Sequence, residues 1–256
     1  LTRIKAVPFL TMTVLSIMTS STSFSQQGTS VYEGDWPSWA GSWNASRYSP
    51  LDQITAENVN DLEIAWKWST QGFGPGTDFV NPSTPLEVDG VLYANVGTTR
   101  NVVALDATSG QALWMFRYDE GTRFDEAPRK GAGRGVAYYN NGEKARIFDI
   151  SPGYQLVSLD PETGIPDPTF GEDGLVDLYV GVRNGDDPRY PHPDIGISAP
   201  PFIMNDVIVV GAAHRTGGRP RSKYNTKGDI RGFDVHSGEL LWTFHTIPES
   251  GEYGYE

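Results

Sequence analysis

The densest group of charged side chains with ligand-binding chemistry lies between His214 and Lys227. These fourteen residues carry no carboxylate and five cations, which are Arg215, Arg219, Arg221, Lys223 and Lys227. Guanidinium and ammonium groups bind carboxylates and phosphates, so the loop could hold an anionic cofactor or substrate. A solvated surface loop is the alternative interpretation of the same charges.

Other side chains that could react show no catalytic or metal-binding spacing. The four histidines, His192, His214, His236 and His245, have no spacing that gathers them on one metal, and only His214 lies near the basic loop. Two acid pairs, Glu172 with Asp173 and Asp186 with Asp187, are predicted to be loop charges. The absence of cysteine excludes thiolate metal sites, a cysteine nucleophile and a disulfide framework.

A repeated segment must position these loops. Ala104–Trp114 returns in diverged form as Gly232–Trp242, and a weaker copy, Ser158–Gly164, runs into Pro166 and Pro168. Each full copy is typical of a β-hairpin: a strand ends in Asp, a turn places Gly where φ is positive, and a second strand closes on Trp. Proline removes ladder donors, so the weaker copy lacks its second strand. We expect each Trp to dock a four-stranded unit onto its neighbour in a propeller or another repeat fold.

Further strands are predicted around this repeat. Glu63–Trp68 alternates apolar and polar residues and is expected to be the strand that opens the array. Thr84–Val96 is predicted to be a hairpin with an Asp-Gly turn. The Pro- and Gly-rich segment from Thr163 to Ile195 is expected to be a long functional or covering loop.

Composition supports an all-β protein and excludes one class of partner. The 256 residues include 29 Gly and 18 Pro, and 12% are aromatic, which favours many short strands joined by turns. The formal net charge of -12 would repel a phosphate backbone, so no nucleic-acid partner is expected.

The first 25 residues resemble a secretory signal. Arg3 and Lys5 precede the apolar run Ala6–Met18, and small residues stand before a cut after Ser25. The run is shorter than the ~20 residues that span a bilayer, so no transmembrane helix is expected beyond the signal, although an uncleaved membrane anchor is the alternative. The protein is therefore predicted to be exported, with membrane association possible.

From about Gly34 to Glu256 the chain resembles the N-terminal portion of a pyrroloquinoline-quinone (PQQ) dependent dehydrogenase. The stretches that carry the resemblance are Gly34–Trp36, Arg47–Ile54, Thr84–Leu86, Gly90–Tyr93, Val103–Ala107, Arg134–Tyr138, Arg146–Phe148, Ser198–Pro201 and Arg231–Val235. The residue types of these stretches, their order and their spacing all agree with the family. The chain is most similar to the glucose dehydrogenase-like branch, because Pro128-Arg129-Lys130 stands where methanol-type enzymes have a vicinal cysteine pair.

The resemblance implies an eight-bladed β-propeller of the quinoprotein type, with about half of the blades in residues 26–256. It also implies oxidation of a sugar or alcohol hydroxyl by hydride transfer to PQQ in the periplasm, with electrons passed to a quinone or cytochrome. An Asp acting as general base is expected beyond Glu256, so the fragment alone is expected to be inactive. A non-catalytic propeller that binds proteins in the envelope is the alternative.

The resemblance also implies roles for individual residues. Arg134 is expected to pair with a PQQ carboxylate, Ser198 is expected to bond the cofactor edge, and Thr84 is a further, weaker candidate for cofactor binding. Thr98 and Thr99, with Arg100, lie at a strand end where the family contacts PQQ, a capped turn being the alternative. The family also places a Ca²⁺ at the quinone, held by acidic or amide ligands, and here Asn225 is the only plausible side-chain ligand in the basic loop.

Overall fold

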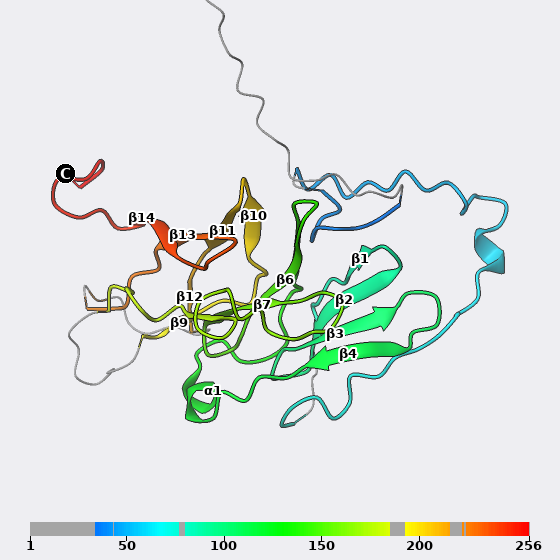
Figure 1. Cartoon of the computed structure of the whole chain (residues 1–256), viewed down its shortest axis with the longest axis horizontal. Helices are drawn as coiled ribbons and strands as arrows, with labels where there is room; N and C mark the ends of the chain where they lie inside the picture. The colour runs from blue at the N-terminus through cyan, green and yellow to red at the C-terminus, as the bar shows by residue number, and fades with distance from the viewer. Residues whose placement is uncertain are drawn as a thin grey trace, which may run out of the picture.

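The computed structural model describes residues 34–42, 44–76, 80–184, 193–215, 222 and 224–255. Within these ranges the chain forms three four-stranded antiparallel sheets and one two-stranded sheet (Figure 1). Helical structure among the same residues is limited to the short α1 (Thr122–Glu126) and the 3-10 turn Val59–Asp61. The all-β class is confirmed, whereas the proposed signal segment 1–25 lies outside the described residues.

Each four-stranded sheet is one blade of a propeller. The first contains β1 (Leu86–Val88), β2 (Val91–Val96), β3 (Asn101–Asp106) and β4 (Ala112–Phe116). The second contains β5 (Ala137–Asn140), β6 (Ala145–Ile150), β7 (Gln155–Leu159) and β8 (Leu175–Asp177). The third contains β10 (Phe202–Met204), β11 (Val207–Val210), β13 (Ile230–Asp234) and β14 (Leu240–Phe244), while β9 (Ile195–Gly196) pairs with β12 (Ala213–His214). The expected partial propeller is thus present as three blades.

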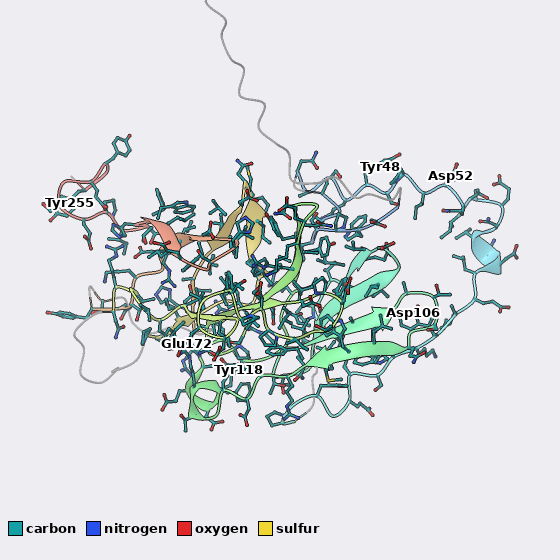
Figure 2. All side chains as sticks on the ribbon, in the orientation of Figure 1. Tyr48, Asp52, Asp106, Tyr118, Glu172 and Tyr255 are labelled. Atoms are coloured by element: carbon teal, nitrogen blue, oxygen red, sulfur yellow. The ribbon has the colours of Figure 1, made fainter. Side chains whose placement is uncertain are left out.

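The blades share two distinct ends, because their strands alternate in direction. We call the end where the first strands β1, β5 and β10 begin the leading end, and the opposite one the turn end. The repeat turns, which run from Asp106 to Gly110 and from Asp234 to Gly238, lie at the turn end. The connections between blades start from the leading end. In Figure 2, Asp106 marks the turn end of the first blade and Tyr118 marks its leading end. Strand β4 runs from one end to the other between these two residues.

The repeat turns adopt the predicted geometry. In the first, the Asp106 carboxylate accepts hydrogen bonds from the Ser109 amide at 2.6 Å and the Ser109 hydroxyl at 2.7 Å. Gly110 supplies φ +70°, which side-chain-bearing residues rarely adopt. The weaker copy at Asp160 repeats these contacts with Thr163, so losing the second strand leaves the turn unchanged.

Trp114 connects the first blade to the repeat turn of the second, as predicted, whereas Val176 and Phe170 of the second blade lie beside Gly238 in the turn of the third. The indole N–H of Trp114 donates to the Pro161 carbonyl at 2.8 Å, and a Cβ on Gly164 would lie 2.4 Å from the ring. Trp66 makes the equivalent contact with the first repeat turn, where its indole N–H donates to the Ala107 carbonyl at 3.0 Å. The glycine at these turns therefore provides both the positive φ and the space for the indole.

The predicted secondary structure of two segments was wrong. Glu63–Trp68 forms no strand, because no described segment pairs with its backbone. Its periodicity reflects Trp66 and Trp68 packing on the first blade. The segment from Thr163 to Ile195 contains β8 and is not one uninterrupted loop. The prolines limit the weaker copy to one bridge, Leu159 with Pro166, and the fourth strand of the blade forms after them.

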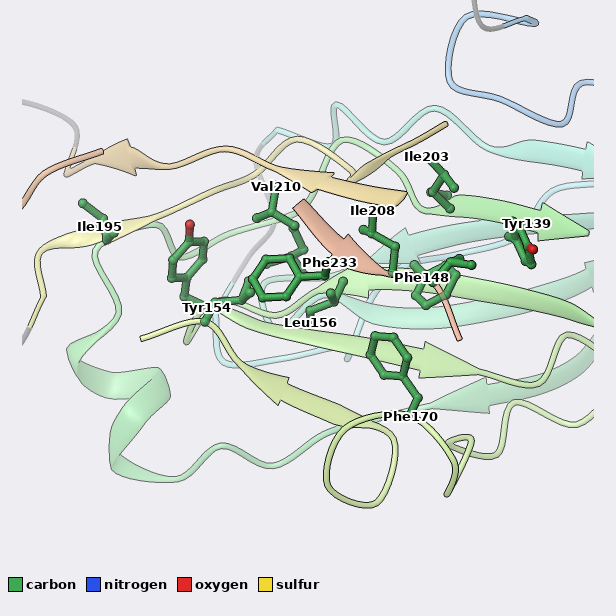
Figure 3. Close-up of a cluster of buried hydrophobic side chains, with 14 residues drawn as sticks. Tyr139, Phe148, Tyr154, Leu156, Phe170, Ile195, Ile203, Ile208, Val210 and Phe233 are labelled. Atoms are coloured by element: carbon green, nitrogen blue, oxygen red, sulfur yellow. The ribbon is translucent and has the colours of Figure 1, made fainter. Parts of the chain in front are cut away.

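The hydrophobic core lies between the blades. One cluster joins the second and third blades through Phe148, Leu156, Ile208 and Phe233 (Figure 3). Phe170 also belongs to it and packs against Phe148 with ring centroids 5.4 Å apart. A second cluster, which includes Leu86, Ile147 and Leu159, joins the first and second blades. Burying each large side chain contributes about 1.5–3 kcal/mol, so blade contacts dominate stability.

The described residues contain no helix with the length and apolar character needed to cross a membrane.

Candidate functional site

Three residues predicted to contact the cofactor lie in one row at the leading end. The Thr84 amide donates to the Arg134 carbonyl at 3.0 Å, and the Arg134 amide donates to the Ser198 carbonyl at 2.8 Å. These residues precede β1, β5 and β10, so each comes from a different blade. We call this arrangement the Thr84–Arg134–Ser198 ladder. It brings together residues that are at least 50 positions apart in the chain.

A glycine allows the ladder to close. Gly135 has φ +137°, and a Cβ at this position would lie 2.9 Å from the Thr84 carbonyl oxygen. A side chain would therefore push the second blade away from the first. The Arg-Gly pair combines a side chain that projects outward with a backbone that fits closely against its neighbour.

The Arg134 guanidinium is available to an anionic ligand. The residue is exposed, and its side chain forms no hydrogen bond or ion pair with the residues that the structure describes. Thr84 and Ser198 are partly exposed beside it. A guanidinium presents a planar set of donors that matches a carboxylate, so this position suits an organic anion.

Thr98 and Thr99 reach the same end on the turn between β2 and β3, but their hydroxyls have local partners. The Thr98 hydroxyl donates to the Pro75 carbonyl at 3.2 Å, and the Thr99 hydroxyl accepts from Asn101 Nδ2 at 3.0 Å. These contacts belong to the capped turn that was the alternative interpretation. Direct contact of either threonine with the cofactor stays a prediction.

Arg100 differs from its threonine neighbours because its side chain points inward. The residue is only 4% exposed, and its guanidinium donates to backbone carbonyl groups. The guanidinium is thus held by the chain itself, and the direct contact with PQQ that the resemblance implies stays a prediction.

A buried polar pair lies behind the ladder, and the sequence analysis did not identify it. Asn95 Nδ2 donates to the Gly135 carbonyl at 3.0 Å and to Asp149 Oδ1 at 3.2 Å. Burial raises the pKa of the Asp149 carboxyl to about 7, although the charge of Arg100 and the Asn95 hydrogen bond oppose this shift. The signal was present in the sequence, since Asn95 and Asp149 each stand between apolar residues of a strand.

The metal prediction receives no geometric support from the described residues. Among them no three His, Asp or Glu side chains gather closely enough to hold a metal ion. Asn225 lies on the connection between β12 and β13, at the leading end, and its carbonyl oxygen accepts from the Lys227 ammonium at 2.7 Å. Its role as a ligand stays a prediction.

The remaining candidate side chains have structural contacts or lie outside the described residues. Arg215 pairs with buried Asp194 at 3.2 Å, and His214 Nε2 lies 2.9 Å from the Thr226 carbonyl. His236 stacks edge-on against Tyr139, and His245 pairs with Glu252 at 2.7 Å. Glu172 and Asp173 are exposed loop residues, as predicted. Arg219, Arg221, Lys223, His192, Asp186 and Asp187 lie outside the described residues.

Comparison with known proteins gives consistent matches. The family model described as PQQ, glucose/ethanol/alcohol dehydrogenase, β-propeller domain, matches residues 36–255. Quinoprotein glucose dehydrogenase of Escherichia coli (strain K12) is 32% identical over 230 residues, which cover 84% of this chain and 27% of that protein. The glycerol dehydrogenase large subunit of Gluconobacter thailandicus is 28% identical over 229 residues, which cover 86% of this chain and 30% of that subunit.

Solved structures also match. The quinohemoprotein alcohol dehydrogenase ADHIIG from Pseudomonas putida HK5 superimposes with a TM-score of 0.64 at 26% identity, over 84% of this chain and 27% of that one. The chain therefore spans less than one third of the length of these relatives.

Proposed function

The chain belongs to the PQQ-type glucose/ethanol/alcohol dehydrogenase β-propeller family, and from this premise we propose that it forms part of the cofactor-binding wall of an exported quinoprotein oxidoreductase. The whole protein would oxidise a hydroxyl group of a sugar or alcohol. This chain would contribute three blades and the ladder at their leading end.

The observation that carries the proposal is the exposed Arg134 guanidinium at the centre of the ladder. PQQ is a tricarboxylic acid, and Arg134 has no competing carboxylate among the described residues. A charge-assisted pair of this kind is about twice as strong as a neutral hydrogen bond. The hydroxyls of Thr84 and Ser198, from the neighbouring blades, would bind the polar edge of the same ligand, so the residues present fit an anionic, planar cofactor.

The cofactor and the residues of this chain would have different roles in the reaction. When bound, PQQ would supply the redox chemistry as the hydride acceptor for oxidation of the substrate hydroxyl. Arg134 binds and orients a carboxylate, and the ladder keeps its backbone fixed between two neighbouring blades. The interblade clusters fill the space between neighbouring blades with buried apolar side chains, which excludes water there.

The proton acceptor and most of the Ca²⁺ ligands are proposed to come from the rest of the protein, because this chain spans less than one third of the length of its relatives, with Asn225 contributing to the metal from this chain. Asp149 is unsuited to act as the base toward a substrate, because only 3% of the residue is exposed and it lies behind Gly135 with Asn95. Electrons would then pass to a quinone or cytochrome. Export to the periplasm rests on the proposed signal in residues 1–25.

Reconstitution of the full-length apoprotein tests this function. PQQ and Ca²⁺ are added, PQQ binding is followed by quenching of tryptophan fluorescence, and turnover is followed by dye reduction with glucose, other aldoses and alcohols. Saturable binding with turnover of at least one substrate is the expected result. Absence of PQQ binding would overturn the proposal, and PQQ binding without turnover of any substrate would contradict the dehydrogenase activity and favour a non-catalytic propeller.

A further inference from the structure

Arg100 makes an unusual set of contacts across the leading end. Its Nε donates to the Gly131 carbonyl at 3.0 Å and its Nη2 to the Arg129 carbonyl at 2.6 Å. Both acceptors lie on the connection that leads to Arg134 in the second blade. One side chain of the first blade therefore fixes the segment that carries the exposed guanidinium.

The same guanidinium also reaches the other two blades. Nη1 donates to the Ile197 carbonyl at 2.5 Å and to the Ile150 carbonyl at 3.1 Å. Ile197 directly precedes Ser198, and Ile150 ends β6 in the second blade. Arg100 thus contacts the chain next to Ser198 while Arg134 bonds Ser198 itself, so both arginines hold one strand start in the third blade.

The backbone of Arg100 supports the view that this side chain is constrained to its position. Its φ is +51°, in the left-handed region that favours glycine, yet the residue is an arginine and 4% exposed. Such conformations persist where the surroundings hold the residue in place, and they occur preferentially at ligand-binding sites. A glycine would satisfy the turn, so the arginine is explained by its side-chain contacts.

A buried cation also needs compensation. The backbone carbonyl dipoles face the guanidinium, and the carboxyls of Asp149 and Glu120 interact with it electrostatically. Asp149 in turn accepts from Asn95, which bonds the Gly135 carbonyl. Contacts of Arg100 and Asn95 therefore converge from two sides on the Arg134-Gly135 segment.

We infer that Arg100 is a positioning residue: it holds the Thr84–Arg134–Ser198 ladder in the geometry that binds the anionic cofactor. This inference rests on the proposed function for its ligand, but not for its structural part. A lysine cannot replace the arginine, because its three donors on one nitrogen cannot reach carbonyls spread around a planar group.

Arg146 provides a matched control at the opposite end of the blades. It is 2% exposed, pairs with Asp167 and donates to the Val235 carbonyl of the third blade. It therefore also bridges blades as a buried arginine, but it lies at the turn end, away from the ladder.

The test compares Arg100→Lys with Arg146→Lys in the full-length protein, each at the same interval below its own melting temperature. Hydrogen exchange is measured in peptides that contain the Thr84 and Arg134 amides, and PQQ dissociation constants are measured by fluorescence titration. We expect Arg100→Lys to accelerate exchange at both amides at least tenfold and to raise the PQQ dissociation constant at least tenfold. Arg146→Lys should change each quantity by less than twofold.

The positioning role of Arg100 and the proposed function are overturned by different results. Equal exchange at the ladder amides in both variants would overturn the positioning role, whether or not PQQ binds. Absence of PQQ binding by the parent protein would overturn the proposed function, and the exchange data would still decide the role of Arg100. If Arg100→Lys does not fold, Arg100→Gly accepts the positive φ and removes the whole side chain, with the same expected exchange and binding results.

Discussion

The amide of Arg134 donates to the carbonyl oxygen of Ser198 at 2.8 Å, so the second and third blades meet at two residues predicted to bind the same cofactor. The contact makes the direction of the Arg134 side chain depend on the packing of both blades. Binding-site geometry and blade stability are therefore coupled in this propeller.

Tryptophan docking predicts a difference between two glycine substitutions. Gly164 and Gly142 both have positive φ, but a Cβ on Gly164 would lie 2.4 Å from the Trp114 ring, whereas a Cβ on Gly142 meets nothing within 4 Å. Gly164→Ala should therefore lower the free energy of unfolding by about 1–3 kcal/mol more than Gly142→Ala, because it adds overpacking to the backbone strain. Urea unfolding of the full-length variants measures the difference. Equal losses would show that the indole does not pack closely on the turn.

The ion pair between Arg146 and Asp167 joins buried side chains, so its removal should be costly. Arg146 Nη2 lies 2.6 Å from Asp167 Oδ2, with 3% and 6% of the two side chains exposed. Asp167→Asn should lower the free energy of unfolding by about 3–5 kcal/mol, because the guanidinium stays buried without its carboxylate. Asp177→Asn is the control, since the pair of Asp177 with Arg123 is more exposed and should contribute about 0–1 kcal/mol.

The same carboxylate predicts a loss of stability in acid. Burial alone would raise the pKa of Asp167, but hydrogen bonds from Lys144, Thr169 and Arg146 hold it well below its usual value. Its contribution to stability is therefore fully present above the unfolded-state pKa of about 3.9 and declines as the pH falls toward the lower folded-state pKa. Melting temperatures from pH 5 to pH 2 should fall more steeply in the parent protein than in Asp167→Asn. Parallel curves would contradict this assignment.

Asp149 predicts the opposite pH dependence. Burial raises its folded-state pKa to about 7, above the unfolded-state value of about 3.9. Between these values the folded state binds a proton that the unfolded state has lost, so this residue lowers stability as the pH rises from about 4 to about 7. Asp149→Asn keeps the oxygen that accepts from Asn95 and removes the titration. Its melting temperature should therefore rise relative to that of the parent between pH 5 and pH 8, and an unchanged difference would refute the shift.

Local patterns predicted the blades better than the site. The Asp-Gly hairpin at Asp89 and Gly90 and the turn at Asp106 depend on neighbouring residues, so short-range rules were sufficient. Glu63–Trp68 was misassigned because alternation describes a half-buried segment and does not supply a pairing partner. The inward direction of Arg100 depends on carbonyl groups 29 to 97 positions away, which no local pattern contains.

The family resemblance predicts that Arg134, Thr84 and Ser198 contact the cofactor, but it does not indicate how their backbones are held. Their alignment results from three blades whose first strands begin at the same end. The buried Asn95 and Asp149 were detectable as polar residues between apolar neighbours in their strands, although their pairing depends on the relative position of β2 and β6.

The most direct test of the account is the affinity of the full-length apoprotein for PQQ after removal of one guanidinium. Arg134→Ala is compared with Arg117→Ala, which makes the same charge change at an exposed position just after the outer strand β4. Loss of a charge-assisted pair of about 1.5–3 kcal/mol predicts a dissociation constant roughly 10- to 100-fold higher for Arg134→Ala. Arg117→Ala should remain within twofold of the parent. Binding of PQQ by Arg134→Ala as tightly as by the parent would contradict the proposed site.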